Sequence, residues 1–338
     1  MDPKQQYLAT KNTAVLFDFS SRGKLKVRGS DRISFLNSIL THDIKNLKTG
    51  NGCYAALLTA PAKVLADMNV YVFEDHVLLD VEAGVEAKLA GLLDKYIITE
   101  DVTIENTTPQ TAHFSVEGPQ AEAVLHALTG NKPPLKEFEH FKAGNIEVIK
   151  RSFTGLPAYQ ILTGKDTSKI IREGLAKAGA VQTDLDIWEI LRIEGGWLRY
   201  GIDMDEEISL PETGLDDIAA SETKGCYPGQ EVVARTKTYK GLRRKITKFI
   251  FVTSDKRQET KKNSSHVTSY HPPVTCMPER GSEIYSQDGN AIGKVTSAEF
   301  IPGTDKGAGI GLIEKGFFDS GIEILVETRE GKIKAQTK

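Results

Sequence analysis

Residues 23–40 read GKLKVRGSDRISFLNSIL, and their side-chain pattern changes from that of a strand to that of a helix. Charged and apolar side chains alternate over 23–27, which is the period of a half-buried β-strand. A glycine turn follows at 29–31. Over 32–40 the apolar side chains return at helical spacing, so that they share one face of a helix capped by the turn. The stretch therefore predicts a strand, a turn and a helix that packs back on the sheet.

The same order returns further along the chain. Residues 114–120, FSVEGPQ, precede an apolar-faced helix over 121–128. Each copy is followed by two strands and a helix, first at 68–73, 77–81 and 85–93, and then at 146–150, 158–162 and 168–178. Repetition of whole units predicts two related α+β lobes from a gene duplication, although such element orders also recur by chance. If the lobes face each other, a small ligand is expected between them.

Beyond residue 248 the pattern predicts β structure alone. Strands are expected at 249–252, 308–313 and 322–328, with a hairpin whose turn is QDGN at 287–290. These strands would form a small sheet or barrel. The segment 254–282 lacks apolar periodicity and is predicted to be a disordered loop. His266 and His271 within it do not have enough companions for a metal site.

The domain division expected from these patterns has three parts. The first α+β lobe takes residues 1–110, the second takes 111–240, and a C-terminal β-barrel takes 241–338. Composition agrees with a globular chain of 338 residues, 39% hydrophobic and 26% charged, with a formal net charge of -3. That charge argues against wholesale coating of nucleic acid. Without a disulfide framework, a signal core or a membrane-length apolar run, the chain is expected to be cytoplasmic. A monomer is expected because no heptad pattern or long apolar edge is evident.

The first functional candidate is residues 224–235, KGCYPGQEVVAR. Cys226 lies between glycines, next to the cation Lys224 and just before a predicted helix, and both neighbours favour a thiolate. The alternative is a small buried cysteine. An acidic run over 203–217 and a basic run over 235–248 flank the motif. Both runs could be solvated faces. Alternatively, the basic run could form a positive collar that stabilises the thiolate and attracts a polyanion.

Several stretches resemble one family. LRIEGGWLRYGIDMDE at 191–206 closely resembles a segment of the glycine-cleavage T-protein family, the folate-dependent aminomethyltransferases. KGCYPGQE at 224–231 resembles the signature of its YgfZ-type branch, which includes mitochondrial iron-sulfur assembly factors. Residues 16–23, 54–59, 64–71 and 292–297 resemble other parts of the family fold. The resemblance implies two ferredoxin-like α+β lobes around a central channel that holds tetrahydrofolate, plus an all-β barrel.

The resemblance also implies site residues. Tyr54 would stack on the pterin, and Asp67 and Glu194 would accept its N–H groups. Tyr200 and Arg235 complete the implied folate site, and Asp67 would also orient the folate for one-carbon transfer. Each has a plainer reading: Tyr54 as core, Asp67 as the end of a strand, and Glu194 as the partner of Arg192 or Arg199.

Two departures from the T-protein pattern matter. Residues 60–63 read APAK where the family commonly has glycines, and Cys226 stands where the T-protein has no thiol. The leading hypothesis is therefore a tetrahydrofolate-binding factor that assists assembly or repair of iron-sulfur enzymes, with Cys226, Lys224 and Asp67 as the active groups. Its expected partners are iron-sulfur client or assembly proteins, among them tRNA-modifying iron-sulfur enzymes.

Two alternatives stay open. The first is a folate-dependent aminomethyltransferase or demethylase, which would not need the thiol. The second is an RNA-binding module built on the basic run, which is weakened by the scarcity of aromatic side chains within it.

Overall fold

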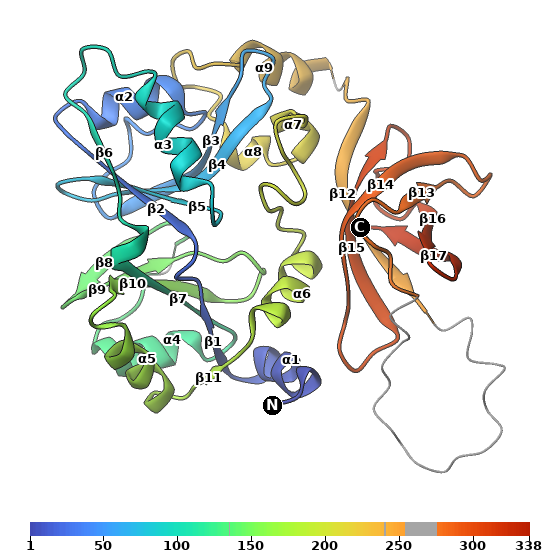
Figure 1. Ribbon diagram of the computed structural model, residues 1–338, viewed down its shortest axis with the longest axis horizontal. Helices are drawn as coiled ribbons and strands as arrows, with labels where there is room; N and C mark the ends of the chain where they lie inside the picture. The colour runs from blue at the N-terminus through green and yellow to red at the C-terminus, as the bar shows by residue number, and fades with distance from the viewer. Residues whose placement is uncertain (135, 240, 254–275) are drawn as a thin grey trace. The chain divides into compact units, whose positions relative to one another are not determined.

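The computed structural model describes residues 1–134, 136–239, 241–253 and 276–338. The chain divides into two compact units, and each is described by itself. The first, here called the paired-sheet unit, comprises Leu8–Leu185 and Met204–Lys240. The second, here called the barrel unit, comprises Met1–Tyr7, Asp186–Asp203 and Gly241–Lys338. The elements of both are labelled in Figure 1.

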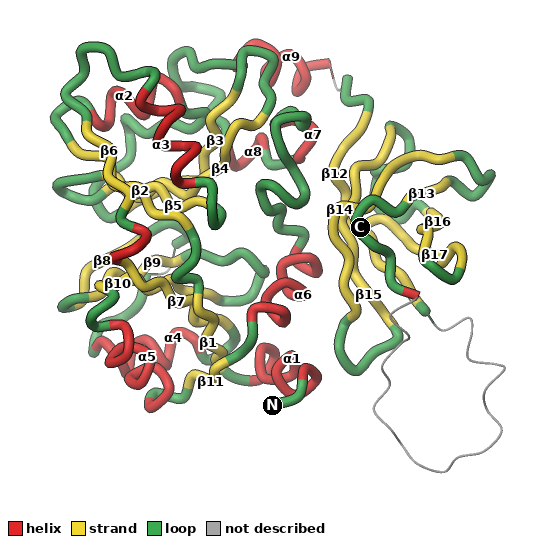
Figure 2. Tube along the Cα trace, viewed as in Figure 1, coloured by secondary structure: helices red, strands yellow, loops and turns green. Residues whose placement is uncertain are grey.

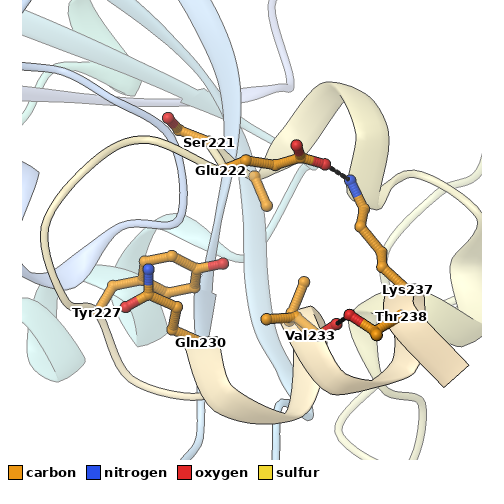
Figure 3. A pocket seen from close by; sticks show the side chains of 9 residues that line it. Ser221, Glu222, Tyr227, Gln230, Val233, Lys237 and Thr238 are labelled. Atoms are coloured by element: carbon orange, nitrogen blue, oxygen red, sulfur yellow. Dashed lines mark hydrogen bonds and ion pairs between the residues drawn. The ribbon is translucent and has the colours of Figure 1, made fainter.

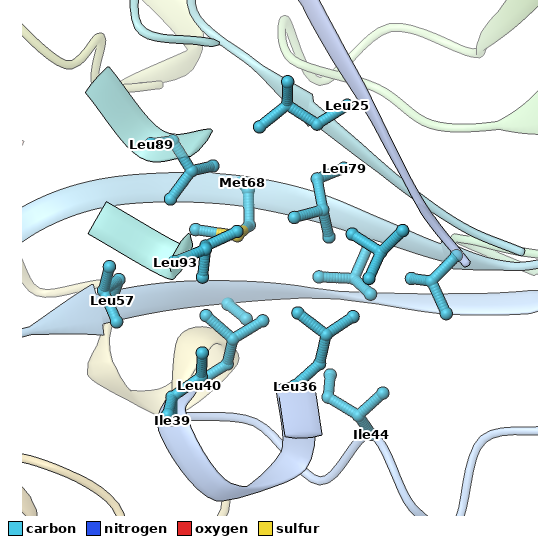
Figure 4. Close-up of a cluster of buried hydrophobic side chains, with 14 of the residues drawn as sticks. Leu25, Leu36, Ile39, Leu40, Ile44, Leu57, Met68, Leu79, Leu89 and Leu93 are labelled. Atoms are coloured by element: carbon cyan, nitrogen blue, oxygen red, sulfur yellow. The ribbon is translucent and has the colours of Figure 1, made fainter. Parts of the chain in front are cut away.

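The first sheet of the paired-sheet unit carries helices on one face. Its strands, in spatial order, are β3 (Asn51–Leu58), β4 (Val64–Val72), β5 (Val77–Val81), β2 (Gly23–Arg28) and β6 (Thr103–Asn106). Helices α2 (Arg32–Ile39) and α3 (Glu86–Asp94) cover it. Figure 4 shows Leu36, Leu89 and Leu93 of these helices packed against Leu25 and Met68 of the strands, where all five are buried. The predicted strand, turn and helix at 23–40 is confirmed.

The second sheet is built in the same way. Its spatial order is β11 (Ala180–Gln182), β1 (Ala14–Asp18), β7 (Thr111–Glu117), β10 (Ala158–Gly164), β9 (Ile146–Lys150) and β8 (His140–Ala143). Helices α4 (Ala121–Thr129) and α5 (Ser168–Lys177) contribute Leu125 and Leu175 to a core with Phe114 and Ile161. The order β3-β4-β5-β2-β6 thus returns as β8-β9-β10-β7-β11, with β1 inserted before β11. This repeated order confirms the two related lobes.

Strand β1 departs from the expected division of the chain. It pairs antiparallel with β7 and parallel with β11, so residues 14–18 belong to the second sheet and not to a lobe formed by 1–110. Ala14 and Leu16 are buried in the core of the second lobe. The expectation followed chain order, whereas the pairing of a strand depends on partners far away in the sequence. Edge strands β3 and β6, and β8 and β11, also extend the predicted order of each lobe.

The helix-free faces of the two sheets meet inside the paired-sheet unit. Tyr71 and Leu78 of the first sheet form one buried cluster with Ile149 and Leu162 of the second. Figure 2 shows α2 and α3 on the outer side of one sheet and α4 and α5 on the outer side of the other. The layers are therefore helix, sheet, sheet and helix. The short turn η1 (Thr108–Gln110) connects β6 of the first sheet to β7 of the second.

Three further helices complete this unit: α7 (Leu210–Thr213), α8 (Asp216–Ala219) and α9 (Gln230–Tyr239). Ser209 and Glu212 form a capping box at the start of α7. The Thr41 hydroxyl donates to the Ala219 carbonyl at 2.5 Å, which ties the end of α8 to the first lobe. The helix predicted after Pro228 is confirmed as α9.

The barrel unit contains most of α6 (Leu185–Gly195), the start of α1 (Pro3–Asn12) and a closed six-stranded barrel. The barrel strands are β12 (Arg244–Val252), β15 (Lys306–Glu314), β14 (Ala291–Phe300), β13 (Glu283–Tyr285), β16 (Glu323–Thr328) and β17 (Gly331–Thr337). The predicted hairpin is confirmed by the pairing of β13 with β14. Gly307 and Gly309 admit the rings of Phe251 and Phe249, since a Cβ would lie 2.1 and 2.3 Å from their Cζ atoms.

The predicted disordered loop at 254–282 lies outside the described residues as far as residue 275, as do His266 and His271. Cys276 is described and is buried, with its Sγ 3.2 Å from Oε2 of Glu330. Within the described ranges, no helix is long and apolar enough to cross a membrane.

Candidate functional site

A carboxylate lies on the helix-free face of the first sheet. Along β4, Ala66, Met68 and Val70 are buried in the helix-covered core, so the alternate residues Asp67 and Asn69 point toward the second sheet. Tyr54 of β3 is a diagonal neighbour of Asp67, because Ala56 is the residue that pairs with Asp67. The Tyr54 hydroxyl donates to Asp67 Oδ2 at 2.8 Å.

The other carboxylate oxygen of Asp67 has no hydrogen-bond partner among the described residues, although it is buried. Burial raises the pKa of Asp67 to about 6, while the Tyr54 hydrogen bond and the Arg22 cation oppose the rise. Buried polar atoms are nearly always paired, and a carboxyl that titrates near neutrality is typical of functional sites. Asp67 is therefore the strongest candidate of this unit for binding or proton transfer.

A buried polar network surrounds this carboxylate. Arg22 donates through Nε and Nη2 to Asp80, at 3.0 and 3.1 Å. Asn69 donates to the same carboxylate at 3.0 Å, and Arg151 from the second sheet donates through Nε to Asn69 at 2.8 Å. All four side chains are buried. The network joins the two sheets and fixes the charges around Asp67, and the sequence analysis did not find it.

The cysteine motif lies in the same unit, between α8 and α9. Cys226 is exposed, whereas Cys53 and Cys276 are buried, which rules out the alternative that Cys226 is a packing residue. Gly229 has a φ of +83°, and a Cβ there would lie 2.7 Å from the Thr59 carbonyl oxygen and 2.9 Å from Ala62 Cα. Glycine at 229 therefore lets the motif lie against the turn between β3 and β4.

Lys224 has a use that the sequence did not predict. Its ammonium donates to the main-chain carbonyls of Asn37, Leu40 and His42, at the C-terminal end of α2. Burial lowers the pKa of Lys224 to about 8. The ammonium thus provides hydrogen bonds to carbonyls that have no partner within the helix. The sequence had predicted a different role for it, beside the Cys226 thiol.

A cavity of about 280 Å³ adjoins the motif (Figure 3). It is lined by Ala220, Ser221, Glu222, Tyr227, Gln230, Val233, Ala234, Lys237 and Thr238. Lys237 lies 2.8 Å from a carboxylate oxygen of Asp217 and 3.0 Å from one of Glu222, so acids that precede the motif offset its charge. Arg235 is exposed on α9. Part of the predicted positive collar is therefore neutralised within the chain.

Glu194 and Tyr200 belong to the barrel unit. The Tyr7 hydroxyl donates to the Glu194 carboxylate, 2.9 Å from each oxygen, and Lys248 donates to the Glu194 carbonyl at 2.8 Å. Burial, reinforced by Glu194, raises the pKa of Tyr7. Tyr200 is buried. Because Tyr54 and Asp67 belong to the other unit, a folate site shared by all four residues stays a prediction.

The neighbouring charges of the barrel unit also form a network. Fully buried Arg192 pairs with Asp203 and Glu189, and it donates to Ser297 Oγ at 2.8 Å. Arg199 binds Glu189 as well, at 3.0 Å. Asp203, expected on a solvated acidic face, is therefore a buried ion-pair partner. No group of three or more His, Cys, Asp or Glu side chains suited to a metal ion occurs in the described part of the chain.

Residues 3–222 match the GCVT N-terminal domain, and residues 267–337 match the glycine cleavage T-protein C-terminal barrel domain. An aminomethyltransferase of Thermosipho melanesiensis is 28% identical over 98% of this chain and 86% of its own length. One from Staphylococcus saprophyticus is 25% identical over 98% of this chain and 88% of its own.

The crystal structure of glycine cleavage system aminomethyltransferase T from Bartonella henselae has a similar fold. It superposes with a TM-score of 0.83 at 23% identity, covering 99% of this chain and 88% of that one. The expected fold class, two α+β lobes with a C-terminal barrel, is confirmed, and the expected cofactor is confirmed at the level of the family, which binds tetrahydrofolate. The chain belongs to the GCVT family, whose N-terminal domain model matches most of its length.

Proposed function

We propose that the chain binds tetrahydrofolate and transfers a one-carbon unit to it, as a folate-dependent aminomethyltransferase or demethylase. The curated relatives quoted above are named aminomethyltransferases over nearly the whole chain. The observation in the structure that carries the proposal is the free, buried oxygen of Asp67.

The residues around Asp67 fit a reduced pterin. Such a ring presents a row of N–H donors, and a carboxylate oxygen without a partner is a strong acceptor for them. The Tyr54 hydroxyl occupies Oδ2, so the free lone pairs of Oδ1 are the ones left for a ligand. Tetrahydrofolate, when bound, supplies the amine nitrogens that accept the one-carbon unit.

Asp67 would also act in proton transfer. With a pKa of about 6, its carboxyl can release or accept a proton near neutral pH, which a general acid or base needs. Arg22, held between Asp80 and Glu82, places a fixed positive charge near it and favours the ionised form. The buried network would keep this balance unchanged during turnover.

The direct test is a transfer assay. The protein is incubated with tetrahydrofolate and methylamine-type donors, and methylenetetrahydrofolate is measured. Asp67→Asn should abolish product, whereas Cys226→Ser should leave it unchanged. Product formation that survives Asp67→Asn would refute the proposed role of this carboxylate.

A second candidate rests on the exposure of Cys226. A thiol that is open to solvent, in a turn that Gly229 holds in place, could act in assembly or repair of iron-sulfur enzymes, as the YgfZ-type resemblance implies. A single thiolate does not hold a cluster, so further ligands would come from a partner protein or from small thiols. Iron-sulfur clients and tRNA-modifying iron-sulfur enzymes would then be its partners.

This candidate predicts a cellular phenotype. In cells that lack the protein, Cys226→Ala and Cys226→Ser should both fail to restore iron-sulfur enzyme activity, while the wild type restores it. Full rescue by both variants would remove the thiol from the function.

A further inference from the structure

A second cavity lies in the paired-sheet unit, where the two lobes meet. Its volume is about 410 Å³. It is lined by Lys26, Phe73, His76, Leu78, Glu105, Thr107, Gln110, Thr111, Lys142, Asn145, Glu147, Leu162, Thr163 and Gly164. Both sheets and the turn between them contribute side chains. Boundaries between lobes are common places for small ligands.

This cavity is separate from the site around Asp67. Phe73 follows directly after β4, and Asp67 lies in the middle of the same strand. At about 3.3 Å per strand residue, the two residues are roughly 20 Å apart. Leu78 and Leu162, which line the cavity, belong to the apolar cluster with Tyr71 and Ile149. The cavity therefore borders that apolar cluster.

Charges of both signs line the cavity. Lys26 and Glu105 come from the first lobe, and Lys142 and Glu147 come from the second. Lys26 stands opposite Glu105 and Lys142 stands opposite Glu147 on paired strands. Among the described residues, none of the four side chains forms a hydrogen bond or a close ion pair. Glu147 is half-buried, and burial raises the pKa of its carboxyl although Lys142 and Lys26 act against the rise. A half-buried carboxylate is costly unless a partner compensates it.

The wall beside these charges is apolar and fixed in place. Phe73 and His76 stack with ring centroids 4.6 Å apart and planes inclined by 6°. His76 Nδ1 lies 2.7 Å from Asp75, which fixes the orientation of its ring. The hydroxyls of Thr111 and Thr163 are already bonded, to the carbonyls of Thr107 and Asn145. The charged side chains, together with the side-chain amides of Gln110 and Asn145, are therefore the groups left to recognise a ligand.

We propose that this cavity binds a small zwitterion, a molecule with one carboxylate and one ammonium group on a short apolar chain. The carboxylate would contact Lys26 and Lys142, and the ammonium would contact Glu147 and Glu105. A ligand of a single sign satisfies one pair and leaves the other repelled or unpaired, so the arrangement selects against it. The short chain would lie on Leu78, Leu162 and the Phe73 ring.

Calorimetry on the full chain tests this proposal. The zwitterionic probes are glycine, 4-aminobutanoate and 6-aminohexanoate, which differ in charge separation, and the single-charge probes are butanoate and butylamine. At least one zwitterion should bind ten times more tightly than either single-charge probe. Failure of all three zwitterions, or equal binding of a zwitterion and a single-charge probe, would overturn the proposal.

Variants locate the binding. Lys26→Gln and Glu147→Gln should each weaken the best zwitterion at least tenfold. The matched controls Lys169→Gln and Glu173→Gln, which alter exposed residues of α5, should leave it unchanged. Thermal unfolding checks that each variant is folded. Equal losses in the cavity variants and the α5 controls, or no loss in either cavity variant, would place the binding elsewhere and contradict the assignment.

Discussion

Asp67 combines two properties that usually conflict. Its carboxylate is buried, yet its Oδ1 atom has no hydrogen-bond partner in the described part of the chain. Because burial raises its pKa from 3.8 to about 6, the ionised form is less stable in the folded chain than in the unfolded one. Residues kept for function often lower stability in this way.

Asp67→Asn should therefore stabilise the protein at neutral pH. A folded pKa above the unfolded one gives stability that is present below about pH 4 and lost as the pH rises through 6. Asparagine does not ionise, so the variant does not lose stability in this way. Its free energy of unfolding should exceed that of the wild type by about 1 to 2 kcal/mol at pH 7.5. Urea unfolding at pH 7.5 and pH 4 measures both values. A difference between variant and wild type that does not change with pH would contradict the proposed electrostatic cause.

Lys224 illustrates a motif residue whose use is structural. Its ammonium donates to three carbonyls at the end of α2. Lys224→Met keeps much of the apolar stem but leaves these carbonyls without a donor, which should cost about 1 to 3 kcal/mol. Chemical unfolding measures the change, and Lys169→Met on exposed α5 is the control. A loss no larger than that of the control would show that water replaces the ammonium without cost.

At the scale of elements, the sequence predicted what depends on local pattern. Helices α2 and α4 begin where the apolar spacing placed them, and α9 begins just after Pro228 as predicted, because those signals lie within a few residues. The cap expected at residues 29–31 is not made by a side chain, since Asp31 forms no capping hydrogen bond. The pairing of β1 with β7 could not be predicted, since its partner is about 100 residues away. Arg22 and Asp80 were missed for the same reason, because Asp80 lies in an apolar strand and its partner belongs to another segment.

The polar layer between the sheets should make the fold sensitive to acid. Burial lowers the pKa of His113 to about 3, although nearby Asp80 opposes the shift. A folded pKa below the unfolded one gives stability that is present above about pH 6.5 and lost as the pH falls. His113→Gln should therefore reduce the loss of unfolding free energy between pH 6.5 and pH 4. The control is His126→Gln at an exposed position of α4, which should leave that loss unchanged.

One outcome would contradict the prediction for His113. If the wild type and His113→Gln lose unfolding free energy equally between these two pH values, His113 does not titrate in the window. The acid sensitivity would then belong to carboxylates or to His140, whose pKa burial lowers to about 4.

At the scale of the whole molecule, the resemblance found in the sequence led to the family, and the local patterns led to the fold class. The candidate site was predicted only through that resemblance: Tyr54 and Asp67 prove to be hydrogen-bonded neighbours on one sheet face. Glu194 and Tyr200 lie in the barrel unit, and their part in folate binding stays a prediction. The motif at 224–231, through its resemblance to the YgfZ-type signature, predicted an active thiol, and the structure adds that this thiol is exposed.

Calorimetric titration of wild type and Asp67→Asn with tetrahydrofolate at pH 7.5 is the most direct test. The wild type should bind, and the variant should bind at least tenfold more weakly, a loss of about 1.4 kcal/mol or more. Equal affinities for the two proteins, or a wild type that does not bind tetrahydrofolate, would contradict the assignment of the folate site to Asp67.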